Sequence, residues 1–201
     1  MRLNAKSTKA ELRRTLRAQR VALSLNQQTR AANRLAAHVL ATPLVEVNTK
    51  IACYVAHDGE IDPRAIVEHI WARHKYCYFP IVPPTCQELL WFAPADTDTT
   101  FAPNRFEGLE PVIDQRQWVR AQALDLILLP LVAFDGRGNR LGRGGGYYDR
   151  SLTFLREREK TRTPTVIGLA HDFQHVDHID VTARDIPLQA VITDEQVYTF
   201  G

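Results

Sequence analysis

Cysteine is scarce in this chain, which has three cysteines among 201 residues, and no two of them form a C-x-x-C pair. An odd count without paired spacing argues against a framework of disulfide bridges. Cys53 and Cys77 lie in apolar runs that are typical of strands. We therefore expect buried free thiols and a reducing, cytoplasmic environment.

Long hydrophobic runs are missing as well. No apolar run approaches the roughly 18 residues that a membrane helix needs, which argues against a spanning segment. The N-terminal stretch MRLNAKSTKAELRRTLRAQR also lacks the apolar core of a secretory signal. The apolar fraction of 45% and the charged fraction of 24% are ordinary for a globular protein. We expect one domain over residues 1–201 that acts as a monomer and binds no membrane.

Acidic residues are nearly absent from the first twenty positions, which carry one acid against seven Lys or Arg. Such a basic arm has three interpretations: an element that binds nucleic acid, an organelle transit peptide, or a clamp for an anionic ligand. The chain shows neither a helix-turn-helix pattern nor an RNA-binding aromatic motif, and its net charge is only +2. We therefore expect no nucleic-acid partner.

The basic arm also carries the signals of a capped helix. Thr8 and Glu11 form a capping box, and apolar residues follow them at helical spacing. Lys9 and Arg13, four residues apart, share one face near the start of this helix. A second capping box at residues 24–27 opens another helix directly afterwards. A transit peptide is rarely capped in this way, so the clamp for an anion is the favoured interpretation.

The rest of the chain alternates between strand and helix patterns, which predicts an α/β fold with a largely parallel open sheet. Asp62 and Pro63 match an N-cap followed by proline at the first helical position. A further helix is expected over residues 147–160. The run LDLILLPLVAF at residues 124–134 is apolar on both faces and predicts a long central strand. The other expected strands span residues 51–55, 76–82, 89–92, 165–170 and 190–193.

Glycine is used sparingly, with ten residues in all, yet six of them lie between Gly136 and Gly146 together with three arginines. This segment leaves the carboxyl end of the expected central strand, which is the edge of an open α/β sheet where ligands bind. Consecutive glycine N–H groups favour an anion, and Arg140 and Arg143 add fork-shaped cations that suit phosphate. The segment matches neither G-x-x-x-x-G-K-[ST] nor G-x-G-x-x-G. A phosphate site and a tight turn with solvated arginines are both compatible with it.

Asp149 lies in the first turn of the helix expected after the glycines. A carboxylate there complements the helix dipole, but beside a polyphosphate it would repel the ligand unless it held a divalent cation. The two interpretations predict opposite outcomes for Asp149→Asn. A cation ligand would lose turnover while the stability of the ligand-free protein holds or rises, and a dipole partner would lose stability and keep turnover.

The sequence L-P-L-V-A-F-D-x-x-G-x-R-L-G-R-G-G-G-Y-Y-D-R at residues 129–150 resembles the signature of the 5-formyltetrahydrofolate cyclo-ligase family, also called methenyltetrahydrofolate synthetases. Weaker pieces occur in the family's order along nearly the whole chain. They are Lys9 with Arg13, the DGEID of residues 58–62, Asn104-Arg105-Phe106 with Glu110-Pro111, and the DIPL of residues 185–188 with the VIT of residues 191–193.

The resemblance implies a three-layer α/β/α sandwich and an ATP- and Mg²⁺-dependent conversion of 5-formyltetrahydrofolate to 5,10-methenyltetrahydrofolate. It implies ATP contacts from Lys9, Arg13, Arg140, Leu141, Gly142, Arg143, Gly144, Gly145, Gly146, Tyr147 and Tyr148. It also implies folate contacts from Val55, Glu60, Arg143, Gly144, Gly145, Gly146 and Tyr147, Mg²⁺ ligands Asp149 and Asp185, and catalytic roles for Arg143 and Tyr147. A sugar-phosphate isomerase or an acyl-transfer enzyme on a related open sheet is the alternative, and ATP dependence separates the two.

Two further clusters have ordinary structural interpretations beside the functional ones. His171, His175 and His178 have a spacing reminiscent of zinc ligands, but no cysteine is near, so a solvated polar loop is favoured. Trp71 and Trp91 are interpreted as core residues rather than as platforms for a ligand.

Overall fold

The computed structural model of the chain describes residues 8–85, 88–106, 108–156, 164–183 and 185–200. The helix expected in the basic arm is α1 (Lys9–Val21), and its capping box is present, since Thr8 Oγ1 accepts from the backbone N–H of Glu11. Ser24 caps α2 (Leu25–Leu40) in the same way. The remaining α-helices are α3 (Leu44–Val47), α4 (Arg64–Ala72) and α5 (Tyr147–Ser151).

A seven-stranded sheet with the order β12-β11-β9-β6-β1-β2-β3 forms the centre of the molecule. The five strands from β11 to β2 in this order run parallel, and the edge strands β12 and β3 are antiparallel to their neighbours. This confirms the α/β fold with a mostly parallel sheet. The strands are β1 (Lys50–Ala52), β2 (Tyr76–Ile81), β3 (Trp91–Ala95), β6 (Leu126–Pro130), β9 (Thr165–Ala170), β11 (Ala190–Thr193) and β12 (Val197–Thr199).

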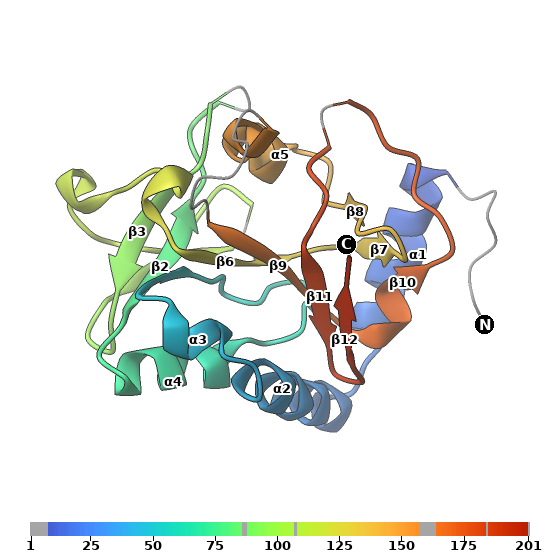
Figure 1. Cartoon of the computed structure of the whole chain (residues 1–201), viewed down its shortest axis with the longest axis horizontal. Coiled ribbons are helices and arrows are strands. Elements are labelled where there is room, and N and C mark those ends of the chain that lie inside the picture. The colour runs from blue at the N-terminus through green and yellow to red at the C-terminus, as the bar shows by residue number, and fades with distance from the viewer. Residues whose placement is uncertain (1–7, 86–87, 107, 157–163, 184, 201) are drawn as a thin grey trace.

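The two faces of the sheet bury different side chains because residues alternate along each strand. In β6, which lies in the middle of the sheet, Leu126 and Leu128 pack in the core shared with α2 and α4. Ile127 and Leu129 point to the other face, where Leu152 just after α5 packs against them. Figure 1 shows α2, α3 and α4 along one side of the sheet and α5 on the opposite side. The three layers expected from the resemblance are therefore present.

The long strand predicted for residues 124–134 is wrong in one respect, because the chain leaves the main sheet after Pro130. Residues 133–135 form β7 (Ala133–Asp135), which joins a separate three-stranded sheet with β8 (Arg140–Leu141) and β10 (His175–Val176). The carbonyls of Leu131 and Val132 accept hydrogen bonds from Gln174 Nε2 at 2.7 and 2.9 Å. Side chains from distant segments therefore take the place of strand partners at this bend.

Helix α1 packs against this small sheet and not against the main one. Leu12 and Leu16 are buried in a third core with Val132, Leu141 and Ile179. Figure 1 shows α1 beside β7, β8 and β10, at one end of the main sheet. The basic arm is thus brought next to the segment that follows the central strand.

Two predicted helices differ in their bounds. Pro63, expected at the first helical position, is itself the N-cap residue of α4, while Asp62 Oδ1 accepts from the N–H of Arg64 at 2.9 Å. The helix expected over residues 147–160 ends as α5 at Ser151, and a 3₁₀ segment, Thr153–Arg156, follows it. Residues 157–160 lie outside the described residues.

Strand bounds differ at two other places. The strand expected over residues 51–55 pairs only as β1 (Lys50–Ala52), and the one expected over residues 89–92 is shifted to β3 (Trp91–Ala95). The cysteine prediction is confirmed for Cys53 and Cys77, which are buried free thiols. Cys86 lies outside the described residues. Among the described residues, no helix combines the length and the apolar character that crossing a bilayer requires.

Candidate functional site

The first glycines of the Gly-rich segment build a hairpin and do not form part of the candidate site. The Asp135 carboxylate accepts from the backbone N–H groups of Arg137 and Asn139 and so closes the turn between β7 and β8. Gly138 has a φ of 79°, and a Cβ there would lie 2.8 Å from the carbonyl oxygen of Leu188. Within the Gly-rich segment, only residues 142–146 therefore remain as a candidate loop for binding an anion.

The second group of glycines leads directly into α5. Gly144 and Gly146 have φ angles of 112° and 63°, which glycine adopts without steric cost, and Gly146 is the N-cap residue of the helix. Gly142 has open space where a Cβ would stand. This short loop leaves its backbone accessible in front of α5, as the sequence predicts for an anion site.

Helix α1 contacts this loop through Arg13, and Lys9 on the same helix pairs with Asp185. Arg13 Nε donates to the carbonyl oxygen of Gly142 at 2.8 Å, and Lys9 Nζ lies 3.8 Å from Asp185 Oδ2. The structure thus brings Arg13 to the Gly-rich loop and Lys9 to Asp185 from distant parts of the chain. The prediction that Lys9 and Arg13 share one working face is consistent with these contacts.

A cavity of about 320 Å³ opens between the loop and the carboxyl ends of β1, β2 and β6. Aromatic and aliphatic groups such as Tyr54, Leu90 and Tyr148 account for much of its wall. The predicted site residues that line it are Val55, Glu60, Arg140, Gly142, Arg143, Gly145, Gly146, Tyr147, Tyr148 and Asp149. Leu141 contributes differently, since its side chain is buried in the core beneath α1.

A second cavity of about 350 Å³ adjoins the first and is strongly cationic. Four arginines line it: Arg13, Arg17, Arg105 and Arg143. It shares His57, Phe106 and Arg143 with the first cavity. Two spaces of different chemistry, one mainly apolar and one cationic, thus meet at Arg143.

Glu60 is an acidic residue in the wall of the apolar cavity, and it is only 7% exposed. Arg143 Nη2 lies 3.0 Å from Glu60 Oε1, and the N–H of His57 donates to Glu60 Oε2 at 3.2 Å. Burial raises the pKa of the Glu60 carboxyl above its ordinary value, and the charges of Arg143 and Arg20 oppose this shift. The Glu60 carboxyl group is therefore buried in the wall of the apolar cavity rather than exposed to solvent.

Asp149 lines the apolar cavity, but its carboxylate is engaged within the protein. Arg140 Nη2 lies 2.5 Å from Asp149 Oδ1, and the N–H of Ile186 approaches the same oxygen at 3.4 Å. The Arg140 guanidinium is 5% exposed and also donates to the carbonyl of Ile186. Arg140, predicted to face phosphate, thus links α5 to the segment that contains Asp185.

Asp185 lies near the Arg140–Asp149 pair, because its neighbour in the chain, Ile186, contacts both of these residues. Its Oδ2 accepts from the N–H and the hydroxyl of Thr182 at 2.7 and 3.1 Å. Within the described ranges, no group of three or more His, Cys, Asp or Glu residues is placed to hold a metal ion. A cation here would therefore rely on one or two carboxylates and on ligand phosphates, which is the usual way that Mg²⁺ is bound.

The hairpin of β4 (Phe101–Pro103) and β5 (Leu109–Pro111) supplies site residues to which the sequence assigned no role. Arg105 donates from Nη2 to the hydroxyl of Tyr147, and the Phe106 and Tyr147 rings lie edge to face with centroids 6.1 Å apart. Asn104 and Phe106 line the apolar cavity. The Asn-Arg-Phe motif was the signal that could have identified them.

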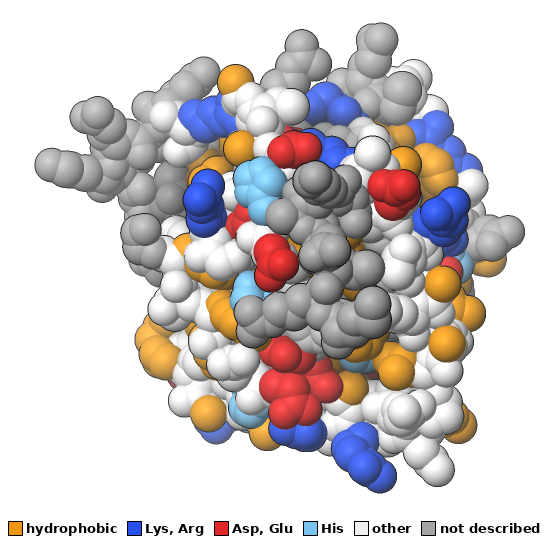
Figure 2. Space-filling view, turned by 90° about the vertical axis from the view of Figure 1, so that its right-hand side faces the viewer, with side chains coloured by type: hydrophobic (Ala, Val, Ile, Leu, Met, Phe, Trp, Pro, Cys, Tyr) orange, Lys and Arg blue, Asp and Glu red, His pale blue; other side chains and the backbone are white. Residues whose placement is uncertain are grey.

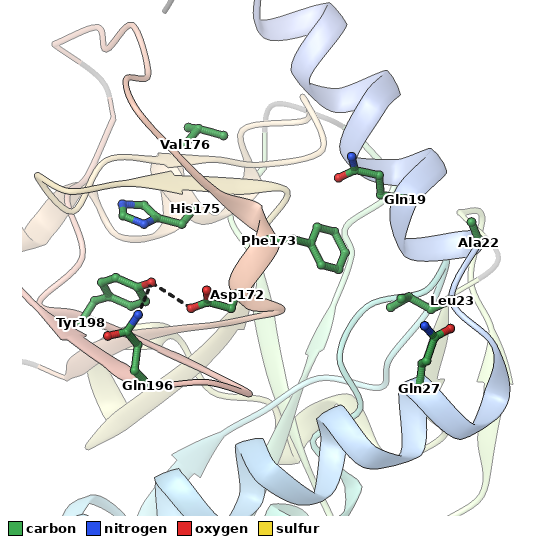
Figure 3. Close-up of a pocket in the computed structure, with 10 residues that line it drawn as sticks. All are labelled: Gln19, Ala22, Leu23, Gln27, Asp172, Phe173, His175, Val176, Gln196 and Tyr198. Atoms are coloured by element: carbon green, nitrogen blue, oxygen red, sulfur yellow. Dashed lines mark hydrogen bonds between the residues drawn. The ribbon is translucent and has the colours of Figure 1, made fainter. Parts of the chain in front are cut away.

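A larger cavity, of about 550 Å³, lies away from these residues, between the end of α1, the start of α2 and the strands β10 and β12. Figure 3 shows three of its polar residues joined by hydrogen bonds, since the Tyr198 hydroxyl donates to Asp172 Oδ1 at 2.8 Å and the Gln196 amide donates to the Tyr198 oxygen at 2.8 Å. The cavity has no cluster of basic side chains. We therefore place the candidate site at the Gly-rich loop.

The three histidines near this cavity do not converge on a metal. His171 is buried with its Nε2 3.2 Å from the carbonyl oxygen of Gly59, so the solvated-loop interpretation is wrong for this residue. His175 stacks on Phe134 with a centroid distance of 4.9 Å. His178 Nε2 lies 3.1 Å from Asp180 Oδ1. The zinc interpretation has no support among the described residues.

Figure 2 shows the face of the molecule at the right-hand side of Figure 1. Outside the grey atoms, acidic and basic side chains are interspersed there, and hydrophobic side chains occur in small groups. The basic residues visible on this face therefore form no continuous stripe. The clustering of arginines is instead a property of the cationic cavity.

Comparisons with known proteins agree with the fold and with the residues at this site. A model of the 5-formyltetrahydrofolate cyclo-ligase family matches residues 5–194. The chain is 35% identical over 183 residues to 5-formyltetrahydrofolate cyclo-ligase of Escherichia coli, covering 91% of this chain and 98% of that one. It is 33% identical over 178 residues to the Haemophilus influenzae protein of the same name, covering 89% and 93%.

Two solved structures share the architecture. The 5,10-methenyltetrahydrofolate synthetase of Aquifex aeolicus superposes with a TM-score of 0.78 at 27% identity, over 95% of this chain and 92% of that one. The synthetase of Mycoplasma pneumoniae superposes with a TM-score of 0.72 at 24% identity, over 94% and 99%, which supports the fold. From the family match and the relatives that cover nearly its full length, we conclude that this chain belongs to the 5-formyltetrahydrofolate cyclo-ligase family.

Proposed function

We propose that the two adjoining cavities hold the two substrates of this ATP-dependent ligase, with 5-formyltetrahydrofolate in the apolar cavity and the ATP phosphates in the cationic one. The reaction of the family is the conversion of 5-formyltetrahydrofolate to 5,10-methenyltetrahydrofolate with release of ADP and phosphate. The observation that supports this arrangement best is Arg143, which lines both cavities. A group there can contact the folate and the transferring phosphoryl group at once.

The apolar cavity suits a flat, heteroaromatic substrate. Tyr54, Phe106, Tyr147 and Tyr148 supply aromatic surface around it, and aromatic rings prefer stacked or edge-to-face contacts with one another. Glu60, held between Arg143 and the N–H of His57, offers carboxylate oxygens to the N–H donors of a pterin-like ring. We therefore assign Val55, Glu60 and Tyr147 to folate binding.

The cationic cavity suits a polyphosphate. Arg13 and Arg143 line it beside the glycine loop, whose backbone can approach an anion closely because four of its residues carry no side chain. Lys9 lies on the same helix one turn earlier. We assign Lys9, Arg13, Gly142, Arg143 and the loop up to residue 148 to ATP binding. Ligand phosphates would compete with Asp185 for Lys9 and with the Gly142 carbonyl for Arg13.

The chemistry requires that a poor leaving group be activated. In 5-formyltetrahydrofolate the formyl oxygen belongs to an amide, so it attacks the γ-phosphorus while the bond from that phosphorus to the ADP oxygen breaks. N10 then adds to the activated formyl carbon, loses its proton, and phosphate leaves as the carbon–oxygen bond breaks. The protein aligns the groups and neutralises the transferring charge. We assign this role to Arg143, together with Tyr147, which lines the same cavity and whose hydroxyl accepts a hydrogen bond from Arg105.

A magnesium ion fits the residues present if phosphates complete its coordination. Asp149 Oδ1 contacts the N–H of Ile186, the residue that follows Asp185 in the chain, which supports a shared role for the two carboxylates. When bound, Mg²⁺ screens phosphate charge during the transfer. We propose Asp149 and Asp185 as its ligands, with Arg140 as the cation that holds Asp149 before the metal binds.

The decisive experiment is to mix the protein with 5-formyltetrahydrofolate, ATP and Mg²⁺ and to follow the absorbance of methenyltetrahydrofolate. Product should form only when ATP and a divalent cation are both present. Product formed at the same rate without ATP would rule out activation by phosphorylation. We further propose that the chain works as a monomer in the cytoplasm without a nucleic-acid or membrane partner, which gel filtration with and without nucleic acid or vesicles would test.

A further inference from the structure

The second half of α1 carries a pair of arginines that the assignments above do not use. Arg20 is fully buried, with Nη2 3.3 Å from Asp58 Oδ2 and Nη1 donating to the carbonyl of Leu131 at 3.3 Å. Arg17, one turn earlier, donates from Nε to the same Asp58 oxygen. The carboxylate of Asp58 is thus held by two cations from one helix.

Asp58 begins a tight turn that is pressed against this helix. Asp58 and Gly59 both have left-handed φ angles, of 57° and 70°. A Cβ at Gly59 would lie 2.7 to 2.9 Å from the backbone and Cβ of Arg20, so no larger residue fits there. On its other side, the carbonyl oxygen of Gly59 lies 3.2 Å from His171 Nε2. The turn at Asp58 and Gly59 is therefore held by α1 on one side and by His171 on the other. Glu60 is the residue that follows it.

A role in stability alone accounts poorly for Arg20. A buried ion pair gains little net free energy, because removing two charges from water offsets their attraction. Within the described part of the chain, the Nε of Arg20 has no hydrogen-bond partner, which adds to the cost of burying it. An apolar side chain would fill this position at a lower cost in free energy. The charge of Arg20 is therefore best explained by its contact with Asp58.

We infer that Arg20 and Asp58 are positioning residues, which keep the 58–60 turn against α1 so that Glu60 faces the folate cavity. This inference rests on the proposed role of Glu60 in folate binding. The same helix carries Arg13 at the glycine loop. Helix α1 therefore supports both cavities, because Arg13 and Arg17 line the cationic one and Arg20 holds the turn that leads to Glu60.

The test is a comparison of KM for each substrate in Asp58→Asn and Arg20→Met, with melting temperatures measured alongside. Asparagine tolerates the left-handed conformation of residue 58, so Asp58→Asn should fold. Both variants should raise KM for 5-formyltetrahydrofolate by about tenfold or more, and KM for ATP should stay within about twofold. Arg20→Lys, which keeps the cation, should recover part of the loss. Arg14→Ala, an exposed arginine on the same helix, is the control and should change neither KM.

Two results would overturn the inference. One is an unchanged KM for folate in folded Asp58→Asn, and the other is an equal rise of both KM values, which would indicate a general loss of structure. If Arg20→Met does not fold, Asp58→Asn and Arg20→Lys still decide the question. Glu60→Gln separates this inference from the proposed function: an unchanged KM for folate in that variant would remove Glu60 from the folate site, whereas a raised KM there with a normal Asp58→Asn would remove only the positioning role.

Discussion

At the scale of single residues, the fold shifts the pKa values of two nearby carboxyl groups, Asp58 and Glu60, in opposite directions. Burial raises the pKa of Glu60, and the charges of Arg143 and Arg20 offset only part of this shift. Burial also acts to raise the pKa of Asp58, but the hydrogen bond and charge of Arg17 and the charge of Arg20 bring it below the ordinary value. Asp58 is therefore held as a fixed anion, whereas Glu60 is an acid whose charge is costly until a ligand arrives.

The raised pKa of Glu60 predicts a pH dependence of stability. A carboxyl group whose pKa is higher in the folded than in the unfolded protein stabilises the fold at low pH, and this contribution is lost as the pH rises through the folded pKa. The ordinary value is 4.5, so the loss should develop as the pH increases above this value. Without ligands, Glu60→Gln should therefore gain melting temperature relative to the wild type as the pH is raised from about 4 to 7. A difference between the two proteins that is constant over this range would contradict the assignment.

Asp149 behaves differently from the expectation based on the sequence. If Asp149 acted only as a metal ligand or only as a partner of the helix dipole, its mutation would lower either turnover or stability, but not both. The structure pairs it with the buried Arg140 instead, so Asp149→Asn should lower both, with a loss of about 1–3 kcal/mol in the free energy of unfolding because Arg140 loses its anion.

The measurement that still identifies a metal ligand is the Mg²⁺ dependence of turnover. If Asp149 binds the ion, Asp149→Asn should lower turnover by a factor of about 10²–10³ and raise the Mg²⁺ concentration needed for half-maximal activity. A variant with an unchanged Mg²⁺ requirement and a lower melting temperature would leave Asp149 with a purely structural role.

At the scale of elements, α1 is the helix on which nucleotide binding should depend. Arg13→Ala removes the guanidinium that lines the cationic cavity and contacts the Gly142 carbonyl. The loss of one contact to a charged ligand should weaken ATP binding by about 1.5–3 kcal/mol, measured by calorimetry. Arg14→Ala, on the exposed side of the helix, provides the matched control. Equal ATP affinity in the two variants would indicate that Arg13 docks α1 against the glycine loop and does not contact ATP.

The Gly-rich segment divides into two elements with different functions, and a pair of alanine substitutions separates them. Gly138→Ala places a side chain at φ 79° and 2.8 Å from a carbonyl oxygen, so it should lower the melting temperature and leave KM for ATP unchanged in the folded fraction. Gly142→Ala meets nothing within 4 Å, so it should leave stability unchanged and raise KM for ATP. The reverse pattern would show that the hairpin, and not the later loop, binds phosphate.

At the scale of the whole molecule, the site lies where three packing units meet. The main sheet supplies the carboxyl ends of β1, β2 and β6, the small sheet supplies the start of the glycine loop, and the β4–β5 hairpin covers the apolar cavity. Helix α1 joins the small sheet to the 58–60 turn. The small sheet and α1 share a core that is separate from the two cores of the main sheet, so the relative position of the two cavities depends on α1 staying docked.

The sequence by itself determined the parts of this protein that local interactions decide. The capping boxes at Thr8 and Ser24 close over four residues each, so both helix starts are readable without knowing the fold. The strands at residues 165–170 and 190–193 were predicted with their observed bounds, because a buried parallel strand needs a continuous apolar run. The glycine motif and the resemblance likewise identified the family and ten of the 21 residues that line the apolar cavity.

Tertiary structure decided what depends on partners distant in sequence. The break after Pro130 is invisible in a uniformly apolar run, because it arises from Gln174 and Arg20, which bind the carbonyls of the next residues. The pairing of Arg140 with Asp149, and the burial that changes the pKa of Glu60, also require the folded surroundings. Local patterns specify where an element begins and which face it buries, whereas the charge state and the partner of a polar group are set by the side chains that the fold places around it.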